Sequence, residues 1–173
     1  MSSTKTITWK QCRIDQLSAR EVYLLAKLRI DVFVVEQACP YAELDGLDLL
    51  ESTLHILACE GDIPVAYARI LAPECEKNSA RHLPNKPARI GRVVVAHAHR
   101  RQGLATAVMR CAIKHCESEF SGHDQRLAAQ VSVENFYVHL GFTPCSDHYL
   151  EDGIAHVDMV RPSDQSVTSE PQT

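Results

Sequence analysis

Hydrophobic and polar residues follow two different periods in the first half of the chain, and these periods predict its elements. Residues 6–13 are predicted to form a first strand. Ser18 and Glu21 stand three positions apart and form a capping box, so we expect a helix to begin there. The apolar residues of that helix recur at helical spacing: Leu24, Leu25, Leu28, Val32 and Phe33. Residues 54–59 and 64–71 flank the turn Glu60-Gly61-Asp62-Ile63, which favours an antiparallel hairpin.

The second half contains a strand, a helix and a strand in succession. Residues 88–95 read as a buried strand, 103–120 have helical periodicity, and 126–131 form a further strand. Such a crossover makes its two strands parallel. A short helix over 133–140 ends at Gly141, and Glu151-Asp152-Gly153 predicts a second hairpin. The pattern indicates an α+β fold with a mixed sheet and helices on both faces.

Composition and charge narrow the class of protein. The chain has 173 residues, and 18 Lys and Arg against 22 Asp and Glu give a net charge of −4, which argues against a nucleic-acid partner. It contains neither a secretory signal nor the ~20-residue apolar run of a membrane span, so no membrane partner is expected. Seven scattered cysteines are an odd set typical of reduced thiols in a cytoplasmic protein. We predict one domain over residues 6–161, a disordered polar tail over 162–173, and no metal site.

The candidate chemistry lies between the predicted strand and the following helix. There the chain turns through Arg100 and Arg101 and enters the helix at Gly103. Amide groups at a helix start form an anion site, and Gly103 and Ala105 leave the backbone open to a phosphate. Neither the P-loop motif nor the Gly-x-Gly-x-x-Gly motif of dinucleotide-binding domains is present. By itself, the turn is equally consistent with a solvated connection.

Two motifs in order resemble those of the GNAT acetyltransferase superfamily. Arg100-x-x-Gly103-x-Ala105 is similar to its acyl-CoA signature, and Tyr137-x-x-x-Gly141-Phe142 is similar to its closing helix. Further segments resemble the ElaA-like branch: 29–37, 39–41, 67–70, 91–93 and 151–154. The resemblance implies the acyl-CoA N-acyltransferase fold, with a mostly antiparallel sheet and one splayed parallel pair. It also implies acetyl-CoA as co-substrate and direct transfer of the acetyl group to a primary amine.

The resemblance also assigns roles to residues. Those expected to bind the cofactor are Val93, Val94, Val95, Arg100, Arg101, Gln102, Gly103, Leu104, Ala105, Thr106 and Gln130, the last standing where many members have Asn. Tyr137 is the expected acid for the departing thiolate, against the alternative that it only closes the core. Glu36 is the candidate base, against the alternative of a solvated carboxylate at a helix end.

Several alternatives stay open at this level. Glu43, Asp45 and Asp48 could bind a cationic acceptor or be simply solvated, and His55 is expected to be a core histidine. The acceptor is a small-molecule or peptide amine of unknown identity, and a homodimer is one option for the assembly. The rival functions are an acyl-CoA-binding module without turnover and an acyl-homoserine-lactone-synthase-like transferase.

Overall fold

The structure is a computed structural model that describes residues 6–73 and 86–163. The expected disordered tail lies outside the described residues from residue 164 onward. Within the described part of the chain, no helix combines the length and the apolar character needed to cross a bilayer.

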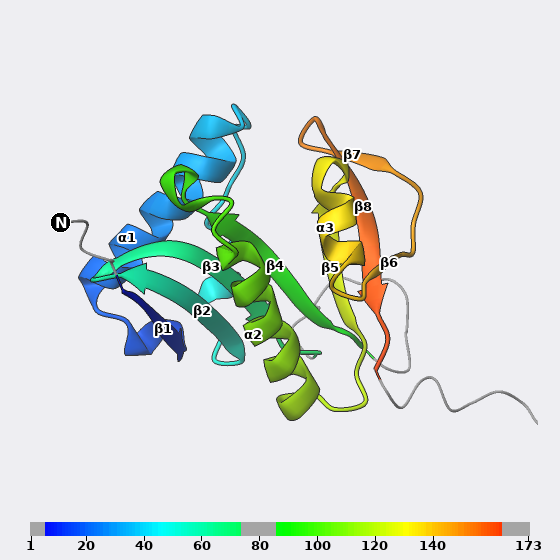
Figure 1. The fold of residues 1–173 in the computed structure, drawn as a ribbon, viewed down its shortest axis with the longest axis horizontal. Helices are drawn as coiled ribbons and strands as arrows, with labels where there is room; N and C mark the ends of the chain where they lie inside the picture. The colour runs from blue at the N-terminus through cyan, green and yellow to red at the C-terminus, as the bar shows by residue number, and fades with distance from the viewer. Residues whose placement is uncertain (1–5, 74–85, 164–173) are drawn as a thin grey trace, which may run out of the picture.

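One twisted, mixed sheet organises the molecule (Figure 1). Its first half is antiparallel and consists of β1 (Ile7–Cys12), β2 (Thr53–Glu60), β3 (Ile63–Leu71) and β4 (Ala88–Val95). Its second half consists of β5 (Gln125–Gln130), β8 (Ile154–Arg161), β6 (Thr143–Pro144) and β7 (Tyr149–Glu151), which pair in antiparallel fashion around β8. The two halves meet where β4 runs parallel to β5. The predicted mixed sheet with one parallel pair is confirmed, while the short strand β6 was not predicted.

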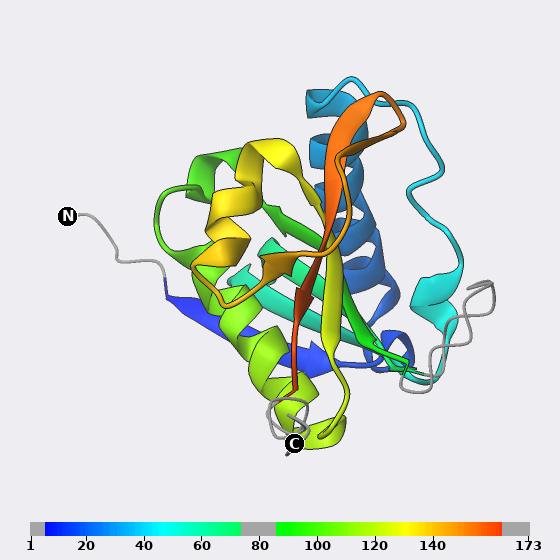
Figure 2. The ribbon, with the colours of Figure 1, turned by 90° about the vertical axis from the view of Figure 1, so that its right-hand side faces the viewer.

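Helices cover both faces of the sheet, as expected (Figure 2). The helix α1 (Ala19–Ile30) continues into a π-helical turn, η2 (Asp31–Glu36), and packs on the face that carries Leu57, Tyr67 and Val94. The helices α2 (Leu104–Glu119) and α3 (Glu134–Val138) pack on the opposite face. Within residues 6–73 and 86–163, single 3₁₀ turns complete the fold: η1 (Ile14–Gln16), η3 (Leu47–Leu49), η5 (His97–His99) and η6 (Val131–Val133).

The local sequence signals act as expected at two places. At the start of α1, the Ser18 hydroxyl accepts the Glu21 amide, and the Glu21 carboxylate accepts the Ser18 amide at 2.8 Å, which completes the capping box. Between β7 and β8, Asp152 and Gly153 both adopt left-handed backbone angles, with φ of 50° and 81°. Two such residues form the hairpin turn that matches strand twist.

The parallel strands separate soon after they meet. Only two pairs, Ala88 with Gln125 and Arg89 with Arg126, join β4 to β5. Beyond them, β4 carries a bulge opposite β3, since Tyr67 pairs with Val94 but Arg69 pairs with Gly91. Arg92, in the bulge, has a left-handed φ of 53°, which costs about 1 kcal/mol or more for a non-glycine residue. The bulge bends β4 away from β5 and opens a V-shaped gap between the halves of the sheet (Figure 1).

Candidate active site

The turn into α2 presents a row of backbone amides without internal acceptors. The first bond of the helix runs from the Ala107 amide to the Gly103 carbonyl at 3.0 Å. Within the described residues, the amides from Arg101 to Thr106 donate to no backbone carbonyl. Gly103 has a φ of 80°, and a Cβ added there would meet no atom within 4 Å. The corner is therefore open, and it offers a phosphate several N–H groups and the positive end of a helix dipole.

A cavity of about 430 Å³ joins this corner to the splayed strands. Most of the residues that the sequence predicted for the cofactor line it: Val93, Val94, Val95, Arg100, Arg101, Gly103, Leu104, Ala105 and Thr106. Tyr137 lines the same cavity from α3. Sequence reasoning missed His99, Val133 and Phe136, which also line it. The last two stand within one turn of Tyr137, and that spacing on the predicted helix was the available signal.

The free edge of β4 supplies hydrogen-bonding groups to the gap. The amide of Ala96 donates to Val65 of β3 at 2.8 Å, so the amide of the preceding residue, Val95, points to the other side of the strand, toward the gap. The Val95 carbonyl points the same way and accepts from Arg100 Nε at 3.2 Å. An extended chain with amide groups can therefore lie along this edge as an added strand would.

Tyr137 combines a buried ring with a free hydroxyl. Its ring packs edge-on against Phe136 and Phe142, with centroid separations of 5.0 and 6.3 Å. Burial raises the pKa of Tyr137 to about 12, so the hydroxyl is protonated at neutral pH. Among the described residues, no hydrogen-bond partner of this hydroxyl is found. The ring does close the core, as the alternative interpretation held, and the hydroxyl is left to act in the cavity.

Glu36 contacts the cofactor turn through Arg100. Its carboxylate accepts two hydrogen bonds from Arg100, each 2.8 Å long, and both side chains are about 40% exposed. The hydrogen bonds from Arg100 lower the pKa of Glu36. Glu36 is therefore neither a solvated carboxylate nor an isolated base, but one half of a bidentate ion pair.

Two other predicted cofactor residues have protein partners. Gln130, at the end of β5, exchanges hydrogen bonds with Gln37, and it does not line the cavity. Gln102 is exposed, and its amide donates to the Ala98 carbonyl at 3.2 Å. Gln102 thus braces the turn rather than facing the cavity.

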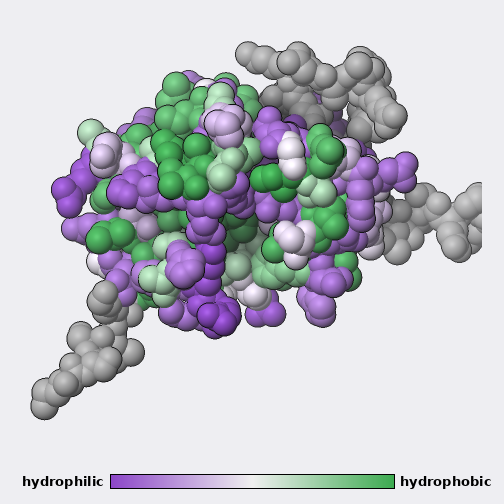
Figure 3. All heavy atoms as spheres, turned by 90° about the horizontal axis from the view of Figure 1, so that it is seen from above, coloured by the Kyte–Doolittle hydropathy of each residue, from purple (hydrophilic) through white to green (hydrophobic). Residues whose placement is uncertain are grey.

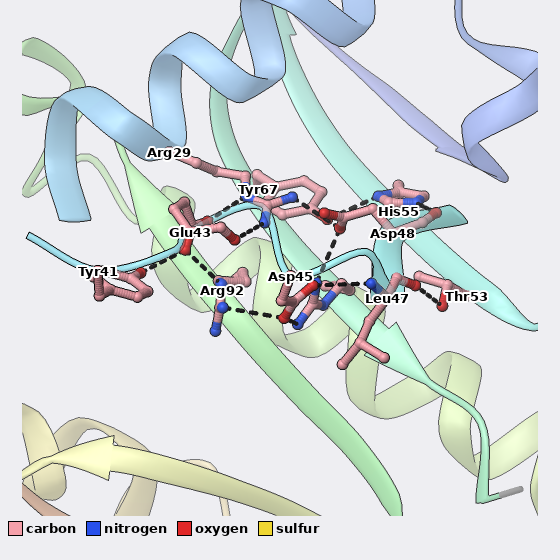
Figure 4. Close-up of polar contacts among 11 residues, drawn as sticks. Arg29, Tyr41, Glu43, Asp45, Leu47, Asp48, Thr53, His55, Tyr67 and Arg92 are labelled. Atoms are coloured by element: carbon pink, nitrogen blue, oxygen red, sulfur yellow. Dashed lines mark hydrogen bonds and ion pairs between the residues drawn. The ribbon is translucent and has the colours of Figure 1, made fainter. Parts of the chain in front are cut away.

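The acidic loop differs from both sequence interpretations. Glu43 and Asp48 are buried, and together with Asp45 they bind three arginines in the network of Figure 4. Arg29 reaches Glu43 at 2.5 Å and Asp48 at 2.8 Å, and Arg69 makes a bidentate pair with Asp45 at 2.7 and 2.8 Å. Arg92 lies 2.7 Å from Glu43 and 3.1 Å from Asp45.

These contacts change the role of the loop. Three carboxylates meet three guanidinium groups, so the local charge sums to zero, and the expected cation-binding surface is corrected to an internal ion-pair network. The face seen from above in Figure 3 carries separate clusters of hydrophobic and hydrophilic residues. The acids hold the loop against β3 and β4.

His55 extends this network as the core histidine that the sequence predicted. Its Nε2 lies 3.2 Å from the Asp48 carbonyl, which can only accept, so Nε2 carries the proton. Its Nδ1 then accepts from the Tyr67 hydroxyl at 2.8 Å. Burial lowers the pKa of His55, which keeps the ring neutral.

Residues 25–162 match the family model for the acetyltransferase (GNAT) domain. The chain belongs to the GNAT acetyltransferase family. Within it the chain falls in the ElaA-like branch, because it is 38% identical to the ElaA protein of Escherichia coli K12 over 155 residues, which are 90% of this chain and 96% of that protein.

Solved GNAT structures agree with this placement. The crystal structure of E. coli ElaA has a TM-score of 0.80 at 37% identity, and an acyl-CoA N-acyltransferase from Pseudomonas aeruginosa has 0.80 at 36%. Each comparison covers 90% of this chain and 99% of the other. The acyl-homoserine-lactone synthase LasI has a TM-score of 0.72 over 91% of this chain and 90% of its own, at 15% identity, and therefore shares the fold alone.

Proposed function

We propose that this GNAT protein transfers the acetyl group of acetyl-CoA directly to a primary amine. The observation that carries the proposal is the convergence on one cavity of the open amides before α2, the free edge of β4 and the Tyr137 hydroxyl. The amides would hold the pyrophosphate, the strand edge would hold the pantetheine arm, and the Val95 amide would polarise the thioester carbonyl.

The reaction needs a base for the amine. An alkylammonium with a pKa of about 10.4 must lose a proton, which costs about 4.6 kcal/mol at pH 7. Glu36 is our candidate for this role, acting through water. Arg100 keeps its carboxylate ionised and thus able to accept a proton, although the lowered pKa weakens it as a base.

The reaction also needs an acid for the departing thiolate. Tyr137 is protonated at neutral pH, and its hydroxyl is free to donate. The apolar surroundings that raise its pKa also raise the proton affinity of a thiolate in the same cavity. A hydrogen bond from Tyr137 to the sulfur therefore stabilises the charge that develops as the thioester breaks.

The test measures thiol release from acetyl-CoA with a panel of amines: small metabolites, peptides and protein lysines. Tyr137→Phe should lower kcat by about 100-fold or more, the usual range for a general acid, with little change in CoA affinity. Equal turnover by this variant would remove the acid role. Binding of acetyl-CoA without thiol release for any amine would favour a module that binds acyl-CoA without turnover.

A further inference from the structure

Two consecutive side chains at the end of η2 contact the two halves of the sheet. Glu36 pairs with Arg100, which follows β4. Gln37 donates to Gln130 Oε1 at 3.3 Å and accepts from Gln130 Nε2 at 3.0 Å. The end of η2 therefore links the first half of the sheet to the second half at the wide end of the gap.

Gln130 stands opposite the strand edge that faces the cavity. The last pair between the parallel strands is Arg89 with Arg126, and four positions further along each strand are Val93 and Gln130. At about 3.3 Å per residue, Gln130 is about 13 Å beyond that pair. Val93 lines the cavity. Gln130 does not line it, but by this register it stands across the gap from Val93, on the strand that faces the path proposed for the pantetheine arm.

The reciprocal bonds leave half of the Gln130 amide available. A primary amide has two N–H donors and an oxygen that accepts twice. Gln37 occupies one N–H and one acceptor position of the Gln130 amide. One N–H and one acceptor position of Gln130 therefore remain for an amide group of a ligand. Glutamine is among the side chains that lose most freedom when they are fixed, and Gln37 fixes Gln130 before any ligand binds.

Gln37 is itself held by the π-helical turn η2 that follows α1. Its backbone amide donates to the Val32 carbonyl at 3.3 Å, and the Cys39 amide donates to the Val34 carbonyl at 3.1 Å. Val32 is part of the core under α1. The next residue, Ala38, leaves the helix with a φ of 50°. The Gln37 side chain therefore projects from an anchored backbone.

We propose that Gln37 is a positioning residue that presets the Gln130 amide to hydrogen-bond the amide groups of the pantetheine arm. The inference rests on the proposed function, because it requires an acyl-CoA in the cleft. Glu36 contacts Arg100, which follows β4 in the first half of the sheet, so the bridge at the end of η2 holds both halves in register.

Calorimetric titration with two ligands tests the proposal. CoA contains the pantetheine arm, whereas 3′-phosphoadenosine 5′-diphosphate contains only the nucleotide end. Gln37→Ala should weaken CoA binding about five- to tenfold, the value of one or two hydrogen bonds, and change nucleotide binding less than about twofold. Gln130→Ala should give a similar loss, and the double variant should lose no more than Gln130→Ala alone.

The controls separate positioning from folding. Gln11→Ala replaces an exposed glutamine on β1 and should leave both affinities unchanged. Gln37→Asn keeps the amide but shortens its reach, so it should lose CoA affinity as Gln37→Ala does. Unchanged CoA affinity in both Gln37 variants, an equal loss for the two ligands, or additive losses in the double variant would overturn the positioning role. A wild-type protein that binds neither ligand would instead overturn the proposed function.

Discussion

Arg29 is the most deeply buried charge of the ion-pair network, and its removal should be costly. Its side chain is 2% exposed and contacts Glu43 at 2.5 Å, Asp48 at 2.8 Å and the Glu43 carbonyl at 3.2 Å. Removing one partner of a buried pair costs about 3–5 kcal/mol, because the other charge stays buried and unpaired. Here Glu43 retains Arg92 at 2.7 Å and Asp48 retains Arg69 at 3.1 Å. Arg29→Met should therefore cost about 3 kcal/mol, the low end of that range.

Urea denaturation followed by circular dichroism measures this loss. For a chain of this size, about 3 kcal/mol also lowers Tm by about 6–12 °C. The matched control is Lys27→Met, because Lys27 of α1 pairs with Asp31, one turn further at the start of η2, but both side chains are more than half exposed. That variant should change stability by less than about 0.5 kcal/mol. A loss below about 1 kcal/mol for Arg29→Met, or equal losses in the two variants, would refute the reasoning.

Three further predictions concern the cofactor turn, the candidate base and acid stability. Gly103→Glu should weaken CoA binding at least about 100-fold in calorimetry, because it places bulk and charge where the phosphates bind. The control is Gly61→Glu, since Gly61 also has a left-handed φ and open space around it. An equal loss of CoA affinity in the control would attribute the effect to backbone strain rather than to the phosphate site. Glu36→Gln should lower kcat about tenfold or more at pH 7 and remove the acidic limb of the kcat/KM profile, whereas an unaltered profile would exclude the base role. Burial acts to raise the pKa of Asp45, but hydrogen bonds from Arg69 outweigh it and lower that pKa to about 2. Its stabilisation is thus full above the unfolded value of about 4 and lost as pH falls toward 2, so unfolding measured from pH 5 to 2 should depend less on pH in Asp45→Asn.

Most of the fold can be predicted from local signals in the sequence. The capping box at Ser18, the strand over Ala88–Val95 and the Asp152-Gly153 turn depend on neighbouring residues alone, and each is found where the pattern predicts it. The cofactor turn is of the same kind, because its amides become available as soon as a helix starts near Gly103. Such features can be predicted because no distant partner decides them.

Features that depend on distant partners could not be predicted. Arg29 meets acids 14 and 19 positions away, and Gln37 meets a residue 93 positions away. No local pattern distinguishes such carboxylates from solvated ones, which is why the acidic loop was interpreted as a surface. The left-handed Arg92 is a similar case, since arginine has no preference for that conformation and the pairing of β3 with β4 imposes it.

The wide turn η2 that follows α1 has a consequence for changes in chain length. A π-helical turn holds about one residue more than an α-helical turn, so η2 absorbs an extra residue without altering the direction of the chain after it. A homologue one residue shorter within Asp31–Glu36 can close this turn to ordinary helical geometry and keep both bridging contacts. A deletion between Glu36 and Cys39 has no such compensation, because each residue of a helix turns by about 100° and the side chains would face elsewhere. Natural length variation in this lineage should therefore be found before Glu36 rather than after it.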